Sequence, residues 1–179
     1  MIYRYRISLP GIKGFARLYE VKSTSSLYSF AKQMRADMNF PQDQMILFKA
    51  MDADGNVAAR YGMFDLGAGT IDSVTLGETV KKGQTSFVFF YDTTNANSVI
   101  VTFEGETPAR ANVVYPALVE MKGPDPEEFE NGYVAFEDLP EDKKNPENED
   151  FDEDDEDIDE EDSADEEEFD EDEDEDEDE

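Results

Sequence analysis

The sequence contains no cysteine, no histidine and no tryptophan. The lack of cysteine excludes disulfide bonds, thiolate metal sites and a cysteine nucleophile. The lack of histidine removes the side chain most often used as a general base and as a transition-metal ligand. No apolar run approaches the roughly 20 residues that span a bilayer, and the first residues, MIYRYRISLPGIKG, lack the apolar block of a signal peptide. We therefore predict a cytoplasmic protein with no membrane partner and no cofactor.

Charge is abundant in the sequence but unevenly distributed. The 179 residues have a formal net charge of −32. Residues 1–122 contain thirteen Lys and Arg against twelve Asp and Glu, whereas residues 123–179 contain two Lys against thirty-five acids. From Glu141 onward, twenty-nine of thirty-nine residues are acidic; such a segment repels itself and buries too little apolar surface to offset the entropy of ordering. The composition predicts a compact domain over residues 1–140 and a disordered acidic tail over residues 141–179.

Hydrophobic patterning within the domain predicts several strands and one main helix. Alternating or wholly apolar runs predict strands at Tyr3–Leu9, Phe15–Val21, Met45–Met51, Val57–Tyr61, Phe87–Tyr91, Val99–Phe103 and Asn112–Tyr115. Leu27, Phe30, Met34 and Met38 lie at helical spacing after candidate N-cap serines, which predicts a helix ending near Met38. One further helical turn is expected at 76–82. This order predicts an α+β fold: a mixed sheet with one main helix packed on it and a β-grasp-like first half.

Four segments of the domain occur in the order found in one protein family. They are YRYRISLPGIKG, MNFPQDQMILF, LGETVKKGQTSFVFFYD and YPALVEMKGPDPEEFENGY. Over roughly residues 2–135 the chain resembles the uncharacterised family named after the third open reading frame of an Ri plasmid. The resemblance implies an α+β fold and no established activity. Its most specific part is the middle segment, in which Leu76-Gly77-Glu78 and Tyr91-Asp92 match the family pattern.

The chain departs from the family pattern at several positions. After Asp92 the family pattern has Phe, Gly, Asp, Trp and His, at the positions where this chain has Thr93, Thr94, Asn95, Asn97 and Val99. The family also has Trp at the position of Phe40, and His at the positions of Ala31 and Gln44. The cysteine common near Pro124 is also absent. If any family member uses these histidines or the cysteine for metal binding or catalysis, this chain lacks the side chains to do so. The resemblance therefore implies a diverged member that kept the scaffold.

Tyr91, Asp92, Thr93, Thr94 and Asn95 form the candidate functional surface of the domain. They end a strongly apolar strand in the family's most distinctive segment. The same residues are also ordinary turn chemistry, in which Asp, Thr and Asn side chains bond the local backbone. No nucleophile–base pair and no paired carboxylates can be recognised from the spacing. No catalytic, cofactor-binding or metal-binding residue is therefore assigned.

Two further segments superficially resemble ligand-binding loops. In an EF-hand loop Gly stands sixth and a Glu twelfth, whereas the loop starting at Asp52 has Gly55 fourth and Met63 twelfth. The segment from Gly67 to Thr70 lacks the Lys-Ser/Thr ending of a phosphate-binding loop. Both segments are predicted to be connections between strands.

The distribution of basic residues argues against direct binding of nucleic acid. Such binding needs a concentrated basic patch, and the near-neutral domain has scattered Lys and Arg. Arg4, Arg6, Arg17 and Lys22 are expected to share the outer face of the first hairpin, as a solvated surface.

Three apolar residues, Phe151, Ile158 and Phe169, stand singly among the acids of the tail. As anchors, each would enter a small apolar pocket while neighbouring carboxylates meet a basic rim. In the alternative, the tail is a solubilising segment and the three residues are incidental.

These observations predict a non-enzymatic interaction protein. The domain would bind an unidentified protein partner, while the tail contacts basic partners or shields the domain from nucleic acid. The alternative is an enzyme of unknown reaction whose site lies near Tyr91-Asp92 and uses neither histidine nor cysteine.

Overall fold

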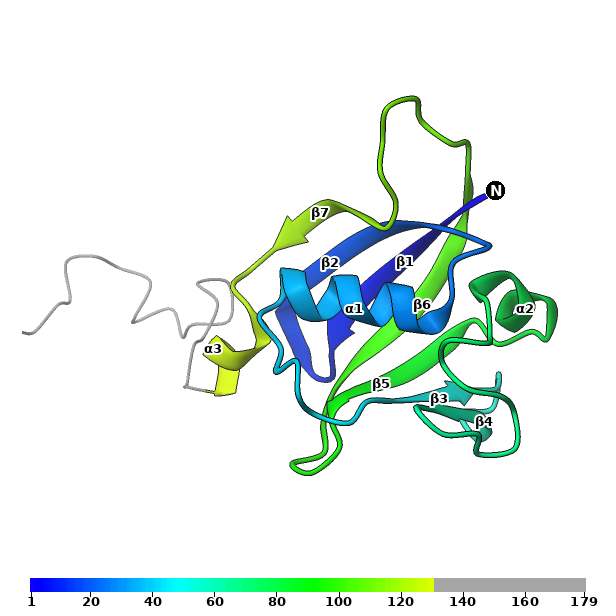
Figure 1. Cartoon of the computed structure of the whole chain (residues 1–179). Coiled ribbons are helices and arrows are strands. Elements are labelled where there is room, and N and C mark those ends of the chain that lie inside the picture. The colour runs from blue at the N-terminus through cyan, green and yellow to red at the C-terminus, as the bar shows by residue number, and fades with distance from the viewer. Residues whose placement is uncertain (131–179) are drawn as a thin grey trace, which may run out of the picture. The chain divides into compact units, whose positions relative to one another are not determined.

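The structure, a computed structural model, describes residues 1–130 (Figure 1). The strands are β1 (Ile2–Leu9), β2 (Ile12–Lys22), β3 (Leu47–Met51), β4 (Val57–Gly62), β5 (Ser86–Asp92), β6 (Asn97–Thr107) and β7 (Ala117–Lys122). The helices are α1 (Leu27–Asp37), α2 (Leu76–Lys81) and α3 (Pro126–Glu130). The predicted tail, with Phe151, Ile158 and Phe169, lies outside the described residues. The α+β class with one main helix on a sheet is confirmed.

The main helix begins and packs as its sequence predicts. The Ser26 hydroxyl accepts a hydrogen bond from the Ser29 amide, 3.2 Å away, and so caps the first turn of α1. The apolar face is fully buried against the sheet, where the Phe30 ring lies 5.4 Å from Tyr5 and 5.5 Å from Tyr19, centroid to centroid. Figure 1 shows α1 lying across one face of the sheet. Asn39, with φ of 54°, follows the helix and turns the chain away from it.

The sheet differs from the prediction in the direction of its strands. Its order is β4-β3-β5-β6-β1-β2-β7, and each pair of named neighbours is antiparallel, so the expectation of a mixed sheet is corrected. Helix α1 crosses from β2 to β3, which run in the same direction. A crossover between adjacent strands would make a parallel pair, but β1, β6 and β5 lie between these two strands, and three alternating strands keep every neighbour antiparallel.

The last strand also lies elsewhere than predicted. The prediction of a strand at Asn112–Tyr115 is wrong. This segment is a loop, with Asn112 at φ of 62°, and β7 begins at Ala117. β7 is an edge strand that pairs only with β2 and is half-buried or exposed along its length. An edge strand that buries so little apolar surface has no clear two-residue hydrophobic alternation, which is why the sequence did not reveal it.

Arg17 lies on the opposite face of the hairpin from the one predicted. On β2 it shares a face with Phe15 and Tyr19, two residues on either side, and its side chain is only 1% exposed. Arg4 and Arg6 do lie on the outer face, away from α1. The position of Arg17 between two aromatic residues of the same alternation was the sequence signal for its burial.

The outer-face arginines pair with carboxylates. The buried carboxylate of Glu20 accepts hydrogen bonds from Arg4 at 3.2 Å and from Arg110 at 2.6 Å, and Arg6 pairs with Glu104. Arg110 belongs to the loop before β7, so the Glu20 contact also fastens that loop to the sheet. These pairs offset much of the positive charge on this face. The absence of a nucleic-acid partner stays a prediction.

The two loop-like motifs form turns stabilised by their own carboxylates. Asp52 Oδ1 accepts hydrogen bonds from the amides of Asp54 and Asn56, at 3.0 and 2.8 Å. Asp65 Oδ1 accepts from the amides of Gly67 and Gly69, at 2.8 and 3.0 Å. Both aspartates thus make the side-chain-to-backbone contacts typical of tight turns.

Candidate binding groove at Tyr91

Two hollows meet at the end of β5, where both are lined by Tyr91 and Asn97. The first has a volume of about 190 Å³ and is completed by Asn39, Phe40, Pro41, Asp92 and Glu127. The second has a volume of about 320 Å³ and is completed by Leu9, Pro10, Ile12, Ala96, Ser98, Pro126 and Phe129. We call the two hollows together the Tyr91 groove. It includes two residues of the predicted candidate surface, Tyr91 and Asp92.

One wall of the groove is the segment that follows α1. The Phe40 ring stacks on Tyr91 with 3.6 Å between centroids and 5° between planes. Phe40 is held in place because its amide donates to the Arg35 carbonyl oxygen at 3.0 Å. The Arg35 side chain in turn donates to the carbonyl oxygen of Pro41, with Nε 2.9 Å away. A buried aromatic pair on a backbone held by these hydrogen bonds makes this wall of the groove rigid.

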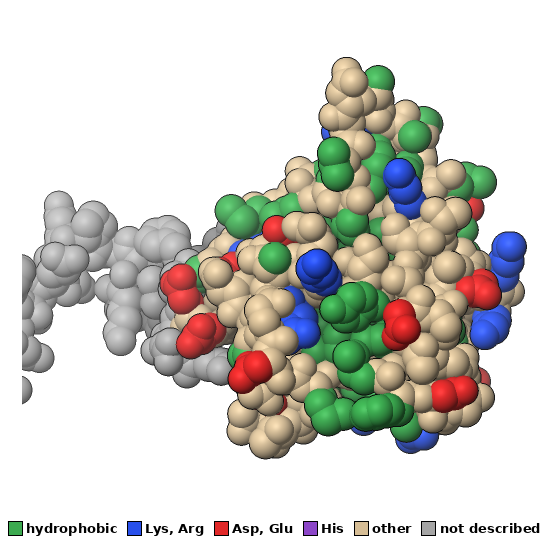
Figure 2. Space-filling model, viewed as in Figure 1, with side chains coloured by type: hydrophobic (Ala, Val, Ile, Leu, Met, Phe, Trp, Pro, Cys, Tyr) green, Lys and Arg blue, Asp and Glu red, His purple; other side chains and the backbone are tan. Residues whose placement is uncertain are grey.

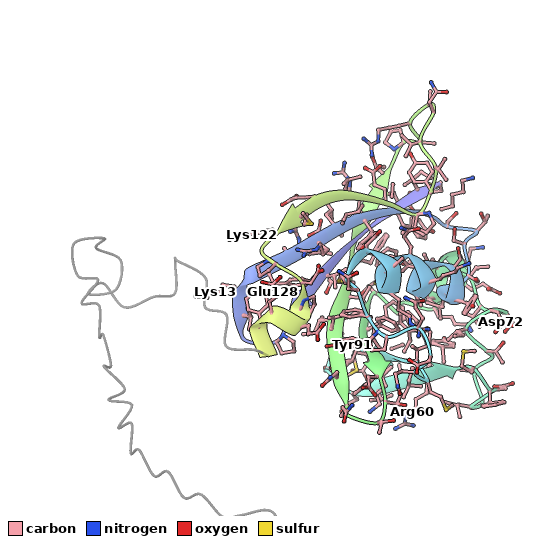
Figure 3. All side chains as sticks on the ribbon, turned by 60° about the vertical axis from the view of Figure 1, so that its left-hand side comes forward. Lys13, Arg60, Asp72, Tyr91, Lys122 and Glu128 are labelled. Carbon is pink, nitrogen blue, oxygen red and sulfur yellow. The ribbon has the colours of Figure 1, made fainter. Side chains whose placement is uncertain are left out.

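A second wall is α3, and Arg17 holds the residues that lead into this helix. The Arg17 guanidinium donates to the carbonyl oxygens of Lys122 at 2.6 Å and Pro124 at 3.0 Å, and to Asp125 Oδ1 at 3.2 Å. The other carboxylate oxygen of Asp125 accepts from Asn39 Nδ2 at 2.7 Å, which ties the residue before α3 to the segment that follows α1. Figure 3 marks α3 by Glu128 and the end of β5 by Tyr91.

Asp92 is bonded into the turn between β5 and β6. Its Oδ1 accepts from the amides of Thr94 at 2.9 Å and Asn95 at 3.2 Å, and its Oδ2 accepts from Asn95 Nδ2 at 2.7 Å. The Asn95 side chain and the two amides favour the ionised form and hold the pKa of Asp92 below its usual range. A carboxylate stabilised in this way is a poor proton acceptor and a poor proton donor near neutral pH.

The pKa of Asp92 predicts a pH-dependent contribution to stability. Since the folded-state pKa lies below the unfolded value of about 3.9, the unfolded chain binds more protons, and the stabilisation is present above that value and lost as the pH falls through the folded pKa. Asp92→Asn should therefore flatten the fall in stability below about pH 4. Urea midpoints measured across this acid range test it, with the exposed Asp72→Asn as a control for loss of one charge. Equal slopes for wild type and Asp92→Asn would contradict the assignment.

The structure divides the predicted candidate surface into three parts. Tyr91 and Asp92 line the groove, Thr94 and Asn95 hold the Asp92 carboxylate, and Thr93 lines a separate apolar hollow on the other side of the turn. The functional role of these five residues stays a prediction.

Sequence reasoning missed most of the groove. It did not bring Phe40, Asn97 or α3 to Tyr91, because these residues come from segments far apart in the chain. A signal was present for two of them: Phe40 and Asn97 are both positions at which the family resemblance expects tryptophan.

The groove offers contact surfaces and amide groups, but no acid–base pair among its described residues. Its polar side chains are the phenol of Tyr91, the amides of Asn39 and Asn97, the turn-bound Asp92, the hydroxyl of Ser98 and the exposed carboxylate of Glu127. Among residues 1–130, no group of three or more acidic side chains is arranged to hold a metal ion. In the same part of the chain, no helix is long and apolar enough to cross a membrane.

Comparisons with known proteins give a family and a structural neighbour. The structure is similar to that of a protein of unknown function, MM3350, from Methanosarcina mazei Go1, with a TM-score of 0.57 and 19% identity over 67% of this chain and 68% of that one. At this identity the likeness shows the fold alone. No curated protein matches the chain. A family model matches residues 1–175, which extends the resemblance beyond residues 2–135 into the acidic segment. The chain belongs to the family of plasmid pRiA4b ORF-3-like proteins.

Proposed function

We propose that this chain is a non-enzymatic interaction protein whose Tyr91 groove receives an extended segment of a protein partner. The observation that carries the proposal is the Phe40–Tyr91 stack between two hollows lined by prolines, apolar side chains and amides. Grooves lined by aromatic rings are a common way to bind extended, proline-containing segments, because such segments lose little entropy on binding. The groove amides of Asn39 and Asn97 suit the backbone groups of such a segment.

The acidic C-terminal segment has a second role in this proposal. It contacts basic surfaces of the partner or keeps nucleic acid away from the domain, because residues 141–179 combine twenty-nine acids with two lysines. An enzyme at Tyr91-Asp92 has less support, since the Asp92 carboxylate is bound into its own turn.

The proposal predicts that two variants of the groove lose partners that a neighbouring variant keeps. Ser98→Tyr would fill the second hollow, and Glu127→Arg would reverse an exposed charge at the first. Glu128→Arg makes the same charge change one residue away on α3, outside both hollows, and is the matched control. With the full chain as bait, affinity capture and mass spectrometry should recover partners with wild type and Glu128→Arg, and fewer with the two groove variants.

In the same experiment, the salt concentration distinguishes partners bound by the groove from partners bound by the acidic segment. Exposed ion pairs weaken steeply as the Debye length falls from about 10 Å at 0.1 M to about 3 Å at 1 M salt, so partners of the acidic segment should be lost at high salt and groove partners retained. If Phe151, Ile158 and Phe169 are anchors, their joint replacement by Ala removes a salt-resistant component. Identical captured sets for wild type and both groove variants would overturn the proposal.

A further inference from the structure

An exposed hydrophobic surface lies on the far side of the β5–β6 turn from the Tyr91 groove. It consists of Met45, before β3, and Met63, Phe64 and Leu66, after β4, and we call these four residues the apolar patch. Their exposed fractions are 55%, 45%, 72% and 55%. They surround a hollow of about 170 Å³ whose other lining residues include Ile46, Leu47 and Thr93. On the face in Figure 2, hydrophobic side chains gather below α1, toward the end of the molecule that carries β3.

The loop that carries most of the apolar patch is ordered by its own hydrogen bonds. Asp65, between Phe64 and Leu66, accepts from the amides of Gly67 and Gly69, and these bonds hold the pKa of its carboxyl below the usual range. A backbone hydrogen bond adds a second constraint, since the Gly62 carbonyl oxygen accepts from the Ile71 amide at 3.0 Å. Large apolar side chains gathered around a hollow on a fixed loop are characteristic of a docking surface, unlike single exposed residues.

Charge decides which occupant fits the apolar patch. Two acids, Asp43 and Asp65, flank its residues in the sequence, and both are exposed. A second copy of this chain would bring another net charge of −32, and the chain's own acidic segment and an anionic membrane have the same sign as these two acids. A basic partner is attracted by the acidic segment and by Asp43 and Asp65 alike. The two methionines suit such a partner because their flexible side chains adapt to aliphatic groups of different shape.

We propose that the apolar patch docks a basic amphipathic helix of a partner protein. Aliphatic side chains of that helix enter the hollow between Met45 and Leu66, while its Lys and Arg residues face Asp43 and Asp65. The acidic C-terminal segment increases the rate of encounter by long-range attraction. This surface is separate from the Tyr91 groove, from which the β5–β6 turn divides it, and the proposal stands independently of the function assigned to that groove.

The test uses a fluorescently labelled synthetic helical peptide of leucine and lysine, amphipathic in design, titrated with the full chain. Phe64→Ser combined with Leu66→Ser should weaken binding at least about tenfold, which corresponds to about 1.4 kcal/mol. Val114→Ser combined with Met121→Ser removes two exposed apolar side chains elsewhere and should leave the affinity unchanged. The groove variant Ser98→Tyr should also bind normally. Since the four replaced side chains are exposed, the thermal unfolding of both double variants should match that of wild type.

Salt and peptide sequence complete the test. At about 1 M salt the electrostatic component is screened, and the remaining affinity should depend on Phe64 and Leu66 and on the amphipathic order of the peptide. Failure of the peptide to bind, equal affinities for the two double variants, or equally tight binding of a scrambled leucine–lysine peptide at high salt would overturn the proposal. So would a dimer in sedimentation that the patch variant converts to monomer, or anionic vesicle binding that the patch variant abolishes.

Discussion

Arg17→Met should be among the most destabilising single substitutions in the domain. The methionine keeps the apolar stem but removes the guanidinium, which is buried and donates to the carbonyl oxygens of Lys122 and Pro124 and to the Asp125 carboxylate. Those acceptors would be left without their charged donor, and breaking such a buried network costs about 3 kcal/mol. Far-UV circular dichroism in a urea titration measures this loss; tryptophan fluorescence is unsuitable because the chain has no tryptophan.

Arg6→Met is the matched control for this result. Arg6 lies on the neighbouring strand β1 and pairs with Glu104, but both side chains are more than a third exposed. A pair of this kind contributes less than about 1 kcal/mol, because water and salt screen it. A loss of stability in Arg17→Met no larger than in Arg6→Met would show that the Arg17 contacts do not hold the β7–α3 connection.

The two-residue hydrophobic alternation that predicted most of the strands also indicated that Arg17 is buried, because Arg17 lies between Phe15 and Tyr19 on the same face of β2. The strongly apolar elements were predictable because each buries a face with a fixed period: every other residue in Tyr3–Leu9 and one stripe on α1. β7, which buries little and shows no such period, was not. Strand direction was not predictable from local pattern either, since the antiparallel order depends on which strands lie between β2 and β3.

The candidate site was predictable only where it is local in sequence. Tyr91-Asp92 was placed correctly at a strand end, and the alternative interpretation of Asp92 as turn chemistry matches its three hydrogen bonds. The rest of the groove depends on long-range packing. Phe40 is positioned against Tyr91 by its hydrogen bond to Arg35 at the end of α1, and α3 is positioned by the contacts of Arg17 with the residues before it. The sequence analysis predicted no helix at Pro126–Glu130, so it could not place α3 beside Tyr91.

Gly123→Ala should weaken the same connection by a different mechanism. Gly123 follows β7 with φ of 74°, and a Cβ at this position would overlap the carbonyl oxygen of Gly14 and lie 3.1 Å from its carbonyl carbon. Backbone atoms cannot move aside as a side chain does, so the end of β7 must shift away from β2. We expect a cost of about 3 kcal/mol: about 1 from the left-handed backbone conformation and about 2 from the overlap.

Gly11→Ala separates these two contributions, because Gly11 has the same φ of 74° and a Cβ added there would meet no heavy atom within 4 Å. It should cost only the conformational part, about 1 kcal/mol. Native-state hydrogen exchange adds a local measurement: in Gly123→Ala the amides of β7 and α3 should lose protection before those of β1 and β6, since the shift begins at their junction. Equal costs for the two glycine variants, or a uniform loss of protection, would mean that Gly123 is not the point that fixes α3 beside the Tyr91 groove.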